Sequence, residues 1–245
     1  MIRLFLPPGG AVGDPAVLVR GERFHYLVHV LRLREGDALE VFDGRGTSRP
    51  AEVVRLQEDR AELCLGAARV APRSREITLV QGLPKGDKLE LILQKGTELD
   101  ASRFLPVTTE RSIVRQVPAR AEAKRERWTR IVEEAARQCG RSDVPEVAAV
   151  TTLQEAISGL RGATGVLVLD EEEHALPLSQ ARAVLERETP LVLVVGPEGG
   201  LTREEVRELV ALGGQPVTLG RLILRTETAS LAALAVLRHL EGSLG

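Results

Sequence analysis

The pattern of hydrophobic positions changes near residue 72. Before it, short apolar runs alternate with turn residues such as Pro-Pro-Gly-Gly at 7–10 and Asp-Gly-Arg-Gly at 43–46. Short runs bounded by Gly, Pro and Asp are typical of strands. We therefore predict a small β-barrel for residues 1–72, interrupted by one helix at about 22–31. The predicted strands cover 2–6, 16–20, 38–42, 51–56 and 60–65.

From residue 73 onward, apolar runs alternate with amphipathic segments. Strands are expected at 77–81, 103–107, 147–150, 166–169, 191–195 and 216–219, and helices at 87–99, 120–139, 152–159, 180–187, 202–212 and 227–241. Such alternation favours a parallel sheet with helices on both faces. We predict an α/β domain over 73–245, joined to the barrel by a polar linker at 70–75.

A glycine-rich loop follows the most apolar of these strands. The run Val192-Leu193-Val194-Val195 leads into Gly196-Pro197-Glu198-Gly199-Gly200. Thr202 and Glu205 then form a capping box that starts a helix. A strand, a glycine loop and a helix N-terminus together are typical of ligand sites in α/β proteins. The alternative is a tight turn, but a plain turn requires neither Pro197 nor Glu198.

This loop does not match the common nucleotide-binding motifs. It lacks the G-x-G-x-x-G pattern and the Lys-Ser/Thr of a phosphate-binding loop, and it lies late in its domain. A dinucleotide fingerprint belongs on the first strand. The loop therefore disfavours a nicotinamide cofactor and the common nucleotide-binding methyltransferase fold.

A second candidate loop runs from Leu219 to Thr228. Thr226 is a candidate N-cap of the last helix, and Glu227 suits the positive end of that helix. Neither role explains the apolar run 222–224, which is suited to the wall of an adenine pocket.

Charge is unevenly distributed along the 245 residues, whose net charge is −2. Residues 1–72 are neutral, residues 73–141 carry +5 and residues 142–245 carry −7. The basic middle block is a candidate contact for a polyanion. A solvated helix face with i,i+4 ion pairs explains the same charges equally simply.

Other composition features narrow the class of protein. The apolar stretches are shorter than the roughly 18 residues of a membrane span, and the N-terminus does not resemble a signal peptide, so we expect a cytoplasmic protein. Cys64 and Cys139 have no metal or redox spacing and are predicted to be buried thiols. His25 and His29 have helical i,i+4 spacing but no evident third ligand. We therefore expect no metal site.

Several motifs together resemble the RsmE family of bacterial 16S ribosomal RNA uridine-N3 methyltransferases, in the SPOUT (trefoil-knot) superfamily. They follow the order of that family over nearly the whole chain. The motifs are His-Tyr-Leu-Val-His-Val-Leu-Arg at 25–32, Phe-Asp-Gly at 42–44, Pro-Lys-Gly-Asp-Lys at 84–88, Gln-Lys-Gly-Thr-Glu-Leu at 94–99, Glu-Arg-Ser at 110–112, Arg-Trp at 127–128, Gln-Cys-Gly-Arg at 138–141, Gly-Pro-Glu-Gly-Gly at 196–200, and Leu-Gly at 219–220 through Glu-Thr-Ala at 227–229.

The resemblance implies a PUA-like RNA-binding barrel at 1–72 and a SPOUT α/β domain at 73–245 with a deep C-terminal trefoil knot. It also implies a homodimer, the cofactor S-adenosylmethionine, and methylation of N3 of a uridine in 16S ribosomal RNA or the small ribosomal subunit. The expected cofactor-binding residues are Leu169, Asp170, Gly196, Pro197, Glu198, Gly199, Gly200, Leu219, Gly220, Ile223, Leu224 and Arg225.

Arg225 is the preferred catalytic candidate, as an electrostatic or orienting group, and Glu198 is the second. Glu198 could act as a base or only organise its loop. Candidate RNA-binding residues are His25, Arg32, Lys85, Lys95, Arg111, Arg115, Arg137, Gln138 and Arg141.

The chain departs from the family pattern at three positions. Gly96 stands where Ala is usual, Asp100 where Gly is common, and Leu222 where an Arg usually precedes the last apolar triplet. The third departure weakens any transfer of that arginine's role, although Arg225 is intact.

Three alternatives remain open at this point. A SPOUT methyltransferase acting on a ribose 2′-hydroxyl or a guanine nitrogen would share the fold and the cofactor. A non-catalytic ribosome-assembly factor would share the RNA surface but would not bind the cofactor. A small-molecule enzyme explains neither the predicted barrel nor the basic block.

Overall fold

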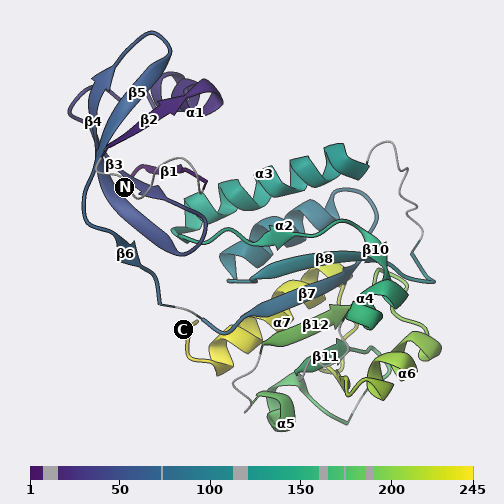
Figure 1. The fold of residues 1–245 in the computed structure, drawn as a ribbon. Coiled ribbons are helices and arrows are strands. Elements are labelled where there is room, and N and C mark those ends of the chain that lie inside the picture. Colours follow the sequence, from purple (N-terminus) through teal and green to yellow (C-terminus); the bar gives the residue numbers. More distant parts are fainter. Residues whose placement is uncertain are drawn as a thin grey trace. The chain divides into compact units, whose positions relative to one another are not determined.

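The computed structural model describes residues 1–7, 16–72, 74–112, 121–159, 165–173, 175–185 and 190–244. The chain separates into two compact units, each with its own core (Figure 1). The first unit comprises Met1–Arg73 and Ala136–Val144, and the second comprises Ser74–Ala135 and Pro145–Gly245.

The first unit is built on a six-stranded, mostly antiparallel sheet. Its strands are β1 (Arg3–Phe5), β2 (Ala16–Arg20), β3 (Ala38–Phe42), β4 (Thr47–Leu56), β5 (Arg60–Leu65) and β6 (Arg69–Val70). In the described residues the sheet follows the path β1-β3-β4-β5-β2, and β6 pairs with β4. The predicted strands are confirmed, while β6 lies where only linker was expected. Alternating inward residues such as Val17, Val19 and Leu63 form the core.

The predicted first helix is more irregular than its sequence pattern indicates. A short α-helix, α1 (Gly21–His25), continues into a π-helical turn at Tyr26–Val30. The wider turn buries Leu27 completely while leaving His25 and His29 exposed.

The second unit is built on a seven-stranded sheet in which all the pairings are parallel, as predicted. Its strands are β7 (Ile77–Gly82), β8 (Arg103–Thr108), β9 (Glu146–Val147), β10 (Thr151–Thr152), β11 (Val166–Leu169), β12 (Leu191–Val195) and β13 (Gln215–Val217). The order is β10-β8-β7-β12-β11-β13, with β9 on β8. The strand predicted at 147–150 is replaced by the short β9 and β10.

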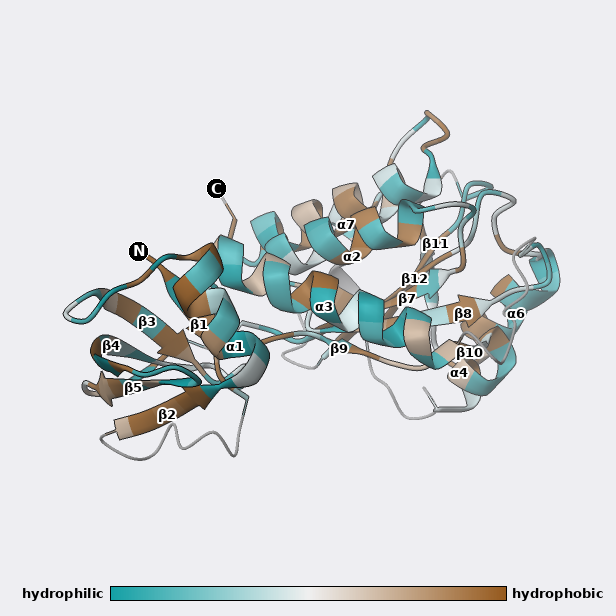
Figure 2. Ribbon diagram, turned by 90° about the horizontal axis from the view of Figure 1, so that it is seen from above, coloured by the Kyte–Doolittle hydropathy of each residue, from teal (hydrophilic) through white to brown (hydrophobic). Residues whose placement is uncertain are grey.

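Helices cover both faces of this sheet (Figure 2). They are α2 (Lys88–Glu98), α3 (Ala121–Cys139, which ends in the first unit), α4 (Leu153–Gly159), α5 (Arg182–Leu185), α6 (Arg203–Ala211) and α7 (Thr226–Leu240). On one face, Val80, Val168 and Val194 pack with apolar residues of α4 and α6. On the other, Phe104 contacts Gly96 of α2, and α2 packs against α7. A Cβ at Gly96 would lie 2.8 Å from the Phe104 ring, so the close approach of α2 requires glycine there.

A buried arginine anchors the end of α7. Arg238 is 2% exposed, donates a 2.8 Å hydrogen bond to the carbonyl of Arg75 and forms an ion pair with Glu241 at 2.7 Å. It also pairs with Asp100 at 3.2 Å. Because removal of one partner leaves a buried charge uncompensated, this cluster fixes the last helix firmly to the domain.

Both cysteines are exposed, so the prediction of buried thiols is wrong. Cys64 lies in β5 between the inward residues Leu63 and Leu65, so the two-residue strand period turns it outward. Cys139 is the last residue of α3. Among the described residues, no helix has the length and hydrophobicity that a membrane span needs.

Candidate functional site

The strand register of the second unit aligns four strand ends in one row. Gln81 of β7 pairs with Val195 of β12, Val195 with Leu169 of β11, and Leu169 with Val217 of β13. Since these strands are parallel, their carboxyl ends lie at one edge of the sheet. The loops that follow them therefore start side by side, where α/β sheets usually bind ligands.

A pocket of about 640 Å³ lies at this edge. Residues from 169–172, 195–201 and 217–229 line it. Most of the predicted cofactor residues are among them, namely Leu169, Asp170, Gly196, Pro197, Glu198, Gly200, Leu219, Gly220, Ile223, Leu224 and Arg225. Gly199 is not part of the lining. The structure thus brings the two loops that the sequence singled out around one cavity.

The glycine loop folds back on itself. A Cβ at Gly196 would lie 2.7 Å from the backbone carbon of Gly200, and Gly200 has a φ of +68°. Both positions therefore need glycine, and the loop backbone lies bare at the pocket wall. The expected capping box follows: Glu205 N–H donates to the Thr202 hydroxyl at 3.2 Å, and Thr202 N–H to the Glu205 carboxylate at 2.8 Å.

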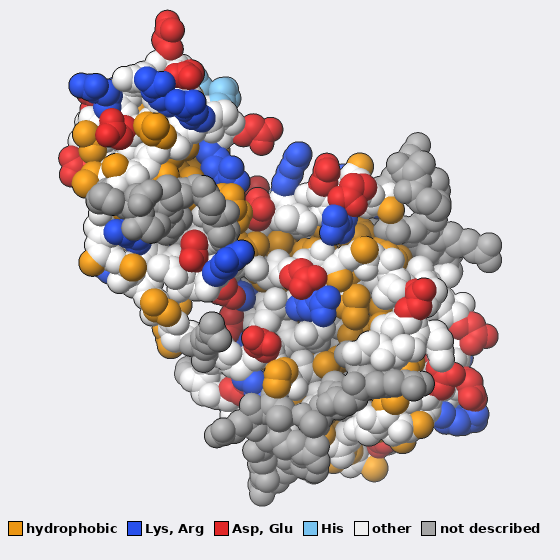
Figure 3. All heavy atoms as spheres, viewed as in Figure 1, with side chains coloured by type: hydrophobic (Ala, Val, Ile, Leu, Met, Phe, Trp, Pro, Cys, Tyr) orange, Lys and Arg blue, Asp and Glu red, His pale blue; other side chains and the backbone are white. Residues whose placement is uncertain are grey.

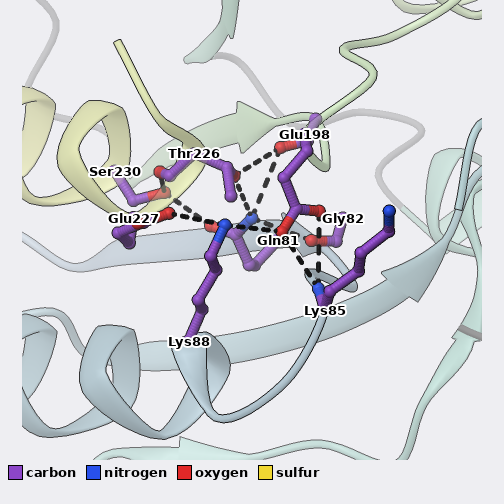
Figure 4. A network of polar contacts seen from close by, with 9 residues as sticks. Gln81, Gly82, Lys85, Lys88, Glu198, Thr226, Glu227 and Ser230 are labelled. Carbon is purple, nitrogen blue, oxygen red and sulfur yellow. Dashed lines mark hydrogen bonds and ion pairs between the residues drawn. The ribbon is translucent and has the colours of Figure 1, made fainter. Parts of the chain in front are cut away.

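The carboxylate of Glu198 is already bonded to the segment that leads into α2. It accepts hydrogen bonds from Lys88 Nζ at 2.8 Å and from the Lys85 N–H at 3.1 Å (Figure 4). Burial alone raises the pKa of Glu198, but the bonds from Lys88 and from backbone N–H groups outweigh it and place the pKa below its ordinary value. Lys88 also forms an ion pair with Glu227 of α7 at 3.5 Å.

The loop after β8 holds the glycine loop from another side. Arg111 donates a 2.8 Å hydrogen bond to the carbonyl of Gly199. The neighbouring Glu110 N–H donates to Glu205 at 2.9 Å, at the start of α6. Arg111 was predicted to bind RNA; in this structure its guanidinium orients a carbonyl of the glycine loop.

The second loop presents apolar and basic side chains. Leu222 is 71% exposed and Ile223 84% exposed, although both line the pocket. Arg225 is the N-cap residue of α7, and its guanidinium forms no hydrogen bond or ion pair with the described residues. The prediction that Thr226 caps this helix is wrong. Thr226 is buried inside the first turn, where its hydroxyl donates to the carbonyl of Gly196 at 2.6 Å.

Asp170 has a structural partner. Its buried carboxylate accepts hydrogen bonds from Arg203 of α6, one of them at 2.8 Å. The ion pair fixes the end of β11 to the helix that follows the glycine loop.

Sequence reasoning missed Gln81. It is 1% exposed and donates hydrogen bonds to Thr226 Oγ1 at 3.0 Å and to the carbonyl of Gly82 at 2.9 Å (Figure 4). The signal was a single amide side chain at the end of an otherwise apolar strand. A buried polar residue in such a run must find hydrogen-bond partners.

The candidate RNA-binding residues of the second unit have different surroundings. Lys85 is exposed next to the glycine loop, whereas Lys95 forms an ion pair with Glu98 at 2.8 Å within α2. Arg115 lies outside the described residues. On the face seen in Figure 3, basic and acidic side chains are interspersed.

Five candidates belong to the first unit. His25, Arg32 and Gln138 are exposed. Arg137 stacks on the ring of Tyr26 at 4.4 Å, and burial lowers the pKa of its guanidinium. Arg141 is bonded to Asp143. Arg32 has a φ of 55°, which is uncommon for a residue other than glycine.

The two histidines considered as metal ligands lie together but without a third. The rings of His25 and His29 are 4.5 Å apart. Among the described residues, no group of three or more His, Cys, Asp or Glu side chains is placed to hold a metal ion.

Two models of protein families match this chain. A model of the RNA methyltransferase domain matches residues 71–238, and a model of the RNA methyltransferase PUA domain matches residues 19–63. These two matches define the class: an RNA methyltransferase with a PUA domain.

Individual relatives identify one family within this class of RNA methyltransferases. The chain is 37% identical over 233 residues to the ribosomal RNA small subunit methyltransferase E of Bacillus subtilis, covering 92% of this chain and 90% of the relative. A structure of the Neisseria gonorrhoeae enzyme of that name, bound to S-adenosylmethionine, matches with a TM-score of 0.87 at 34% identity over 98% of both chains. A putative methyltransferase from Legionella pneumophila, with the cofactor bound, gives a TM-score of 0.80 at 26% identity over 97% of both chains. The chain belongs to the ribosomal RNA small subunit methyltransferase E family.

The Arg111–Gly199 bond predicts a role in cofactor binding that does not involve RNA. We expect Arg111→Ala to weaken S-adenosylmethionine binding about fivefold without RNA, because a loop carbonyl loses an oriented donor. Isothermal titration calorimetry measures the change. Arg103→Ala is the matched control, since Arg103 starts β8, the strand that precedes this loop, and pairs with the exposed Glu146. An unchanged affinity in Arg111→Ala would leave Arg111 with an RNA role only.

Proposed function

We propose that this protein transfers the methyl group of S-adenosylmethionine to N3 of a uridine in 16S ribosomal RNA. The observation that supports this most is the pocket built by the glycine loop and the loop at 219–225, at the carboxyl edge of the sheet, in a chain of this family. The relatives' name specifies the small-subunit ribosomal RNA. The choice of uridine N3 comes from the resemblance of the motifs.

The pocket residues fit the cofactor chemically. The loop backbone at Gly200 offers its carbonyl to an adenine edge, because the Gly200 N–H already donates to Pro197 and the Gly196 carbonyl already accepts from Thr226. Leu219, Ile223 and Leu224 offer apolar surface to the faces of the adenine. Glu171 adds a carboxylate that can accept hydrogen bonds from ribose hydroxyls. When bound, the cofactor supplies an electrophilic methyl group on a sulfonium.

The uridine must lose its N3 proton at or before attack, because a protonated N3 has no free electron pair for the new bond. Negative charge then develops on the ring, including O2 and O4. Arg225 is suited to stabilise it, because the residue lines the pocket and its guanidinium is not bound to another described side chain. We therefore assign Arg225 the electrostatic role.

Glu198 is better suited to organising its loop than to accepting the proton. A carboxylate whose pKa lies below its ordinary value is a weak base near neutral pH. Its oxygens are also directed to Lys88 and Lys85. We therefore favour the loop-organising role, which the sequence left open.

The unit that contains residues 1–72 is proposed to bind RNA around the target. The PUA model match over 19–63 supports this, as do the exposed His25 and Arg32. Because a methylated base must be accessible, the target uridine is expected to be unpaired or flipped out. A homodimer, a cytoplasmic location and a knotted C-terminal segment are further proposals drawn from the resemblance.

The product of the reaction tests the proposed function. We expect purified protein, labelled S-adenosylmethionine and small ribosomal subunits lacking base methylation to yield 3-methyluridine in nucleoside mass spectrometry. A methylated ribose or guanine as the product would show that the enzyme modifies a different RNA atom, as in the SPOUT alternatives. Failure to bind the cofactor, together with no transfer, would favour a non-catalytic assembly factor, whereas cofactor binding without transfer would point to a missing substrate form.

Arg225 provides the test of mechanism. We expect Arg225→Met to lower kcat about a hundredfold while changing cofactor affinity less than about threefold, because the charge acts mainly on the transition state. Single-turnover methylation and calorimetry separate the two effects. Arg207→Met, which removes an exposed arginine paired with Glu204, should leave both values unchanged. An unaltered kcat in Arg225→Met would remove Arg225 from the mechanism.

A further inference from the structure

The two loops that form the pocket are joined by a buried cluster of polar side chains behind it. The cluster consists of Gln81 at the end of β7, Gly196 in the glycine loop, and Thr226 and Ser230 in the first turns of α7 (Figure 4). The side chains of Gln81, Thr226 and Ser230 are at most 5% exposed. We call this set the Gln81 cluster.

Each side-chain polar group of the cluster has at least one hydrogen-bond partner within it. Thr226 Oγ1 donates to the Gly196 carbonyl at 2.6 Å and accepts from Gln81 Nε2 at 3.0 Å. Ser230 Oγ lies within hydrogen-bonding distance of Gln81 Oε1 and of the Thr226 carbonyl. Because Gln81 uses both ends of its amide, a hydrocarbon side chain of similar size could replace none of these contacts.

Gln81 is placed to act on the pocket indirectly. It does not line the pocket, yet Gly196 and Thr226, which it bonds, both do. Thr226 also directly follows Arg225, the proposed catalytic cation. A shift of α7 relative to the glycine loop would therefore move Arg225 and the cofactor wall apart.

We infer that Gln81 is a positioning residue that, through Thr226, fixes the distance between the two cofactor loops before the cofactor binds. The inference rests on the proposed function in that it takes this pocket as the cofactor site. A preset pocket avoids the cost of ordering its loops on binding. Without the Thr226 hydroxyl, two buried groups lose their partner, and separation of the loops would let water reach them.

Lys88 adds a second link on the solvent side. Its ammonium bridges Glu198 of the glycine loop and Glu227 of α7, and the hydrogen bond that it donates to Glu198 raises its pKa. This bridge spans the same two elements as the Gln81 cluster. Exposed ion pairs are weakened by salt, whereas the buried neutral bonds are not, so the cluster should hold the loops together at high ionic strength.

Thr226→Val tests the inference, since it removes the hydroxyl and keeps the shape. We expect the Kd for S-adenosylmethionine, measured by calorimetry well below the melting temperature, to rise about tenfold. Thr226→Ser, which keeps the hydroxyl, should return the Kd to within about twofold of the original. Gln81→Met should also weaken binding, and the double variant Gln81→Met/Thr226→Val should lose less than the sum, because both remove the same bond.

Thr97→Val is the matched control. Thr97 is fully buried in α2 of the same unit, and its hydroxyl donates to the Leu93 carbonyl at 2.7 Å, but it does not line the pocket. We expect it to lower the melting temperature and leave the Kd unchanged. The kinetic constants should differ between the two variants in the same way. Thr226→Val should raise KM for the cofactor, and Thr97→Val should leave it unchanged.

Three results would overturn the inference. The first is a folded Thr226→Val with unchanged Kd, and the second is an equal loss in Thr97→Val. The third is failure of the unaltered protein to bind the cofactor, which would also overturn the proposed function. If the unaltered protein binds the cofactor but does not methylate RNA, only the proposed reaction fails and the cluster can still be tested by binding.

Discussion

The functional site depends on the register of one parallel sheet. By pairing Gln81 with Val195, Val195 with Leu169 and Leu169 with Val217, the backbone aligns four strand ends. Loops separated by more than a hundred residues then start next to one another. A register shift of one residue would turn every side chain to the opposite face of the sheet, against a different set of helices, so the buried valines and leucines of the sheet also define the pocket.

Polar contacts then hold the aligned glycine loop in place. The glycine loop is held by Lys88 and Lys85 through Glu198, by Arg111 through Gly199, and by Thr226 through Gly196. These contacts leave Arg225 without a bound partner among the described residues, in a pocket whose loops are otherwise fixed. A cation that is not already paired, next to fixed pocket walls, is what the proposed electrostatic role of Arg225 requires.

The sequence predicted most of the fold and singled out the two loops that line the pocket, but not the contacts between them. The alternation of strands and helices was enough to predict the parallel sheet, and the glycine patterns identified both loops. The hydrogen-bond roles of Thr226, Arg111 and Gln81 were missed because they join residues 30, 88 and 145 positions apart. Local capping rules favour Thr226 as an N-cap, whereas tertiary packing buries it. The outward Cys64 could have been predicted from the strand period of β5.

The central claim is that the cofactor lies between the glycine loop and the loop at 219–225. Hydrogen–deuterium exchange with and without S-adenosylmethionine tests it most directly. If the cofactor binds there, amide protection on binding is concentrated at 196–201 and 217–225, at the carboxyl edge of the sheet. Protection centred elsewhere, with both loops exchanging as before, would contradict it.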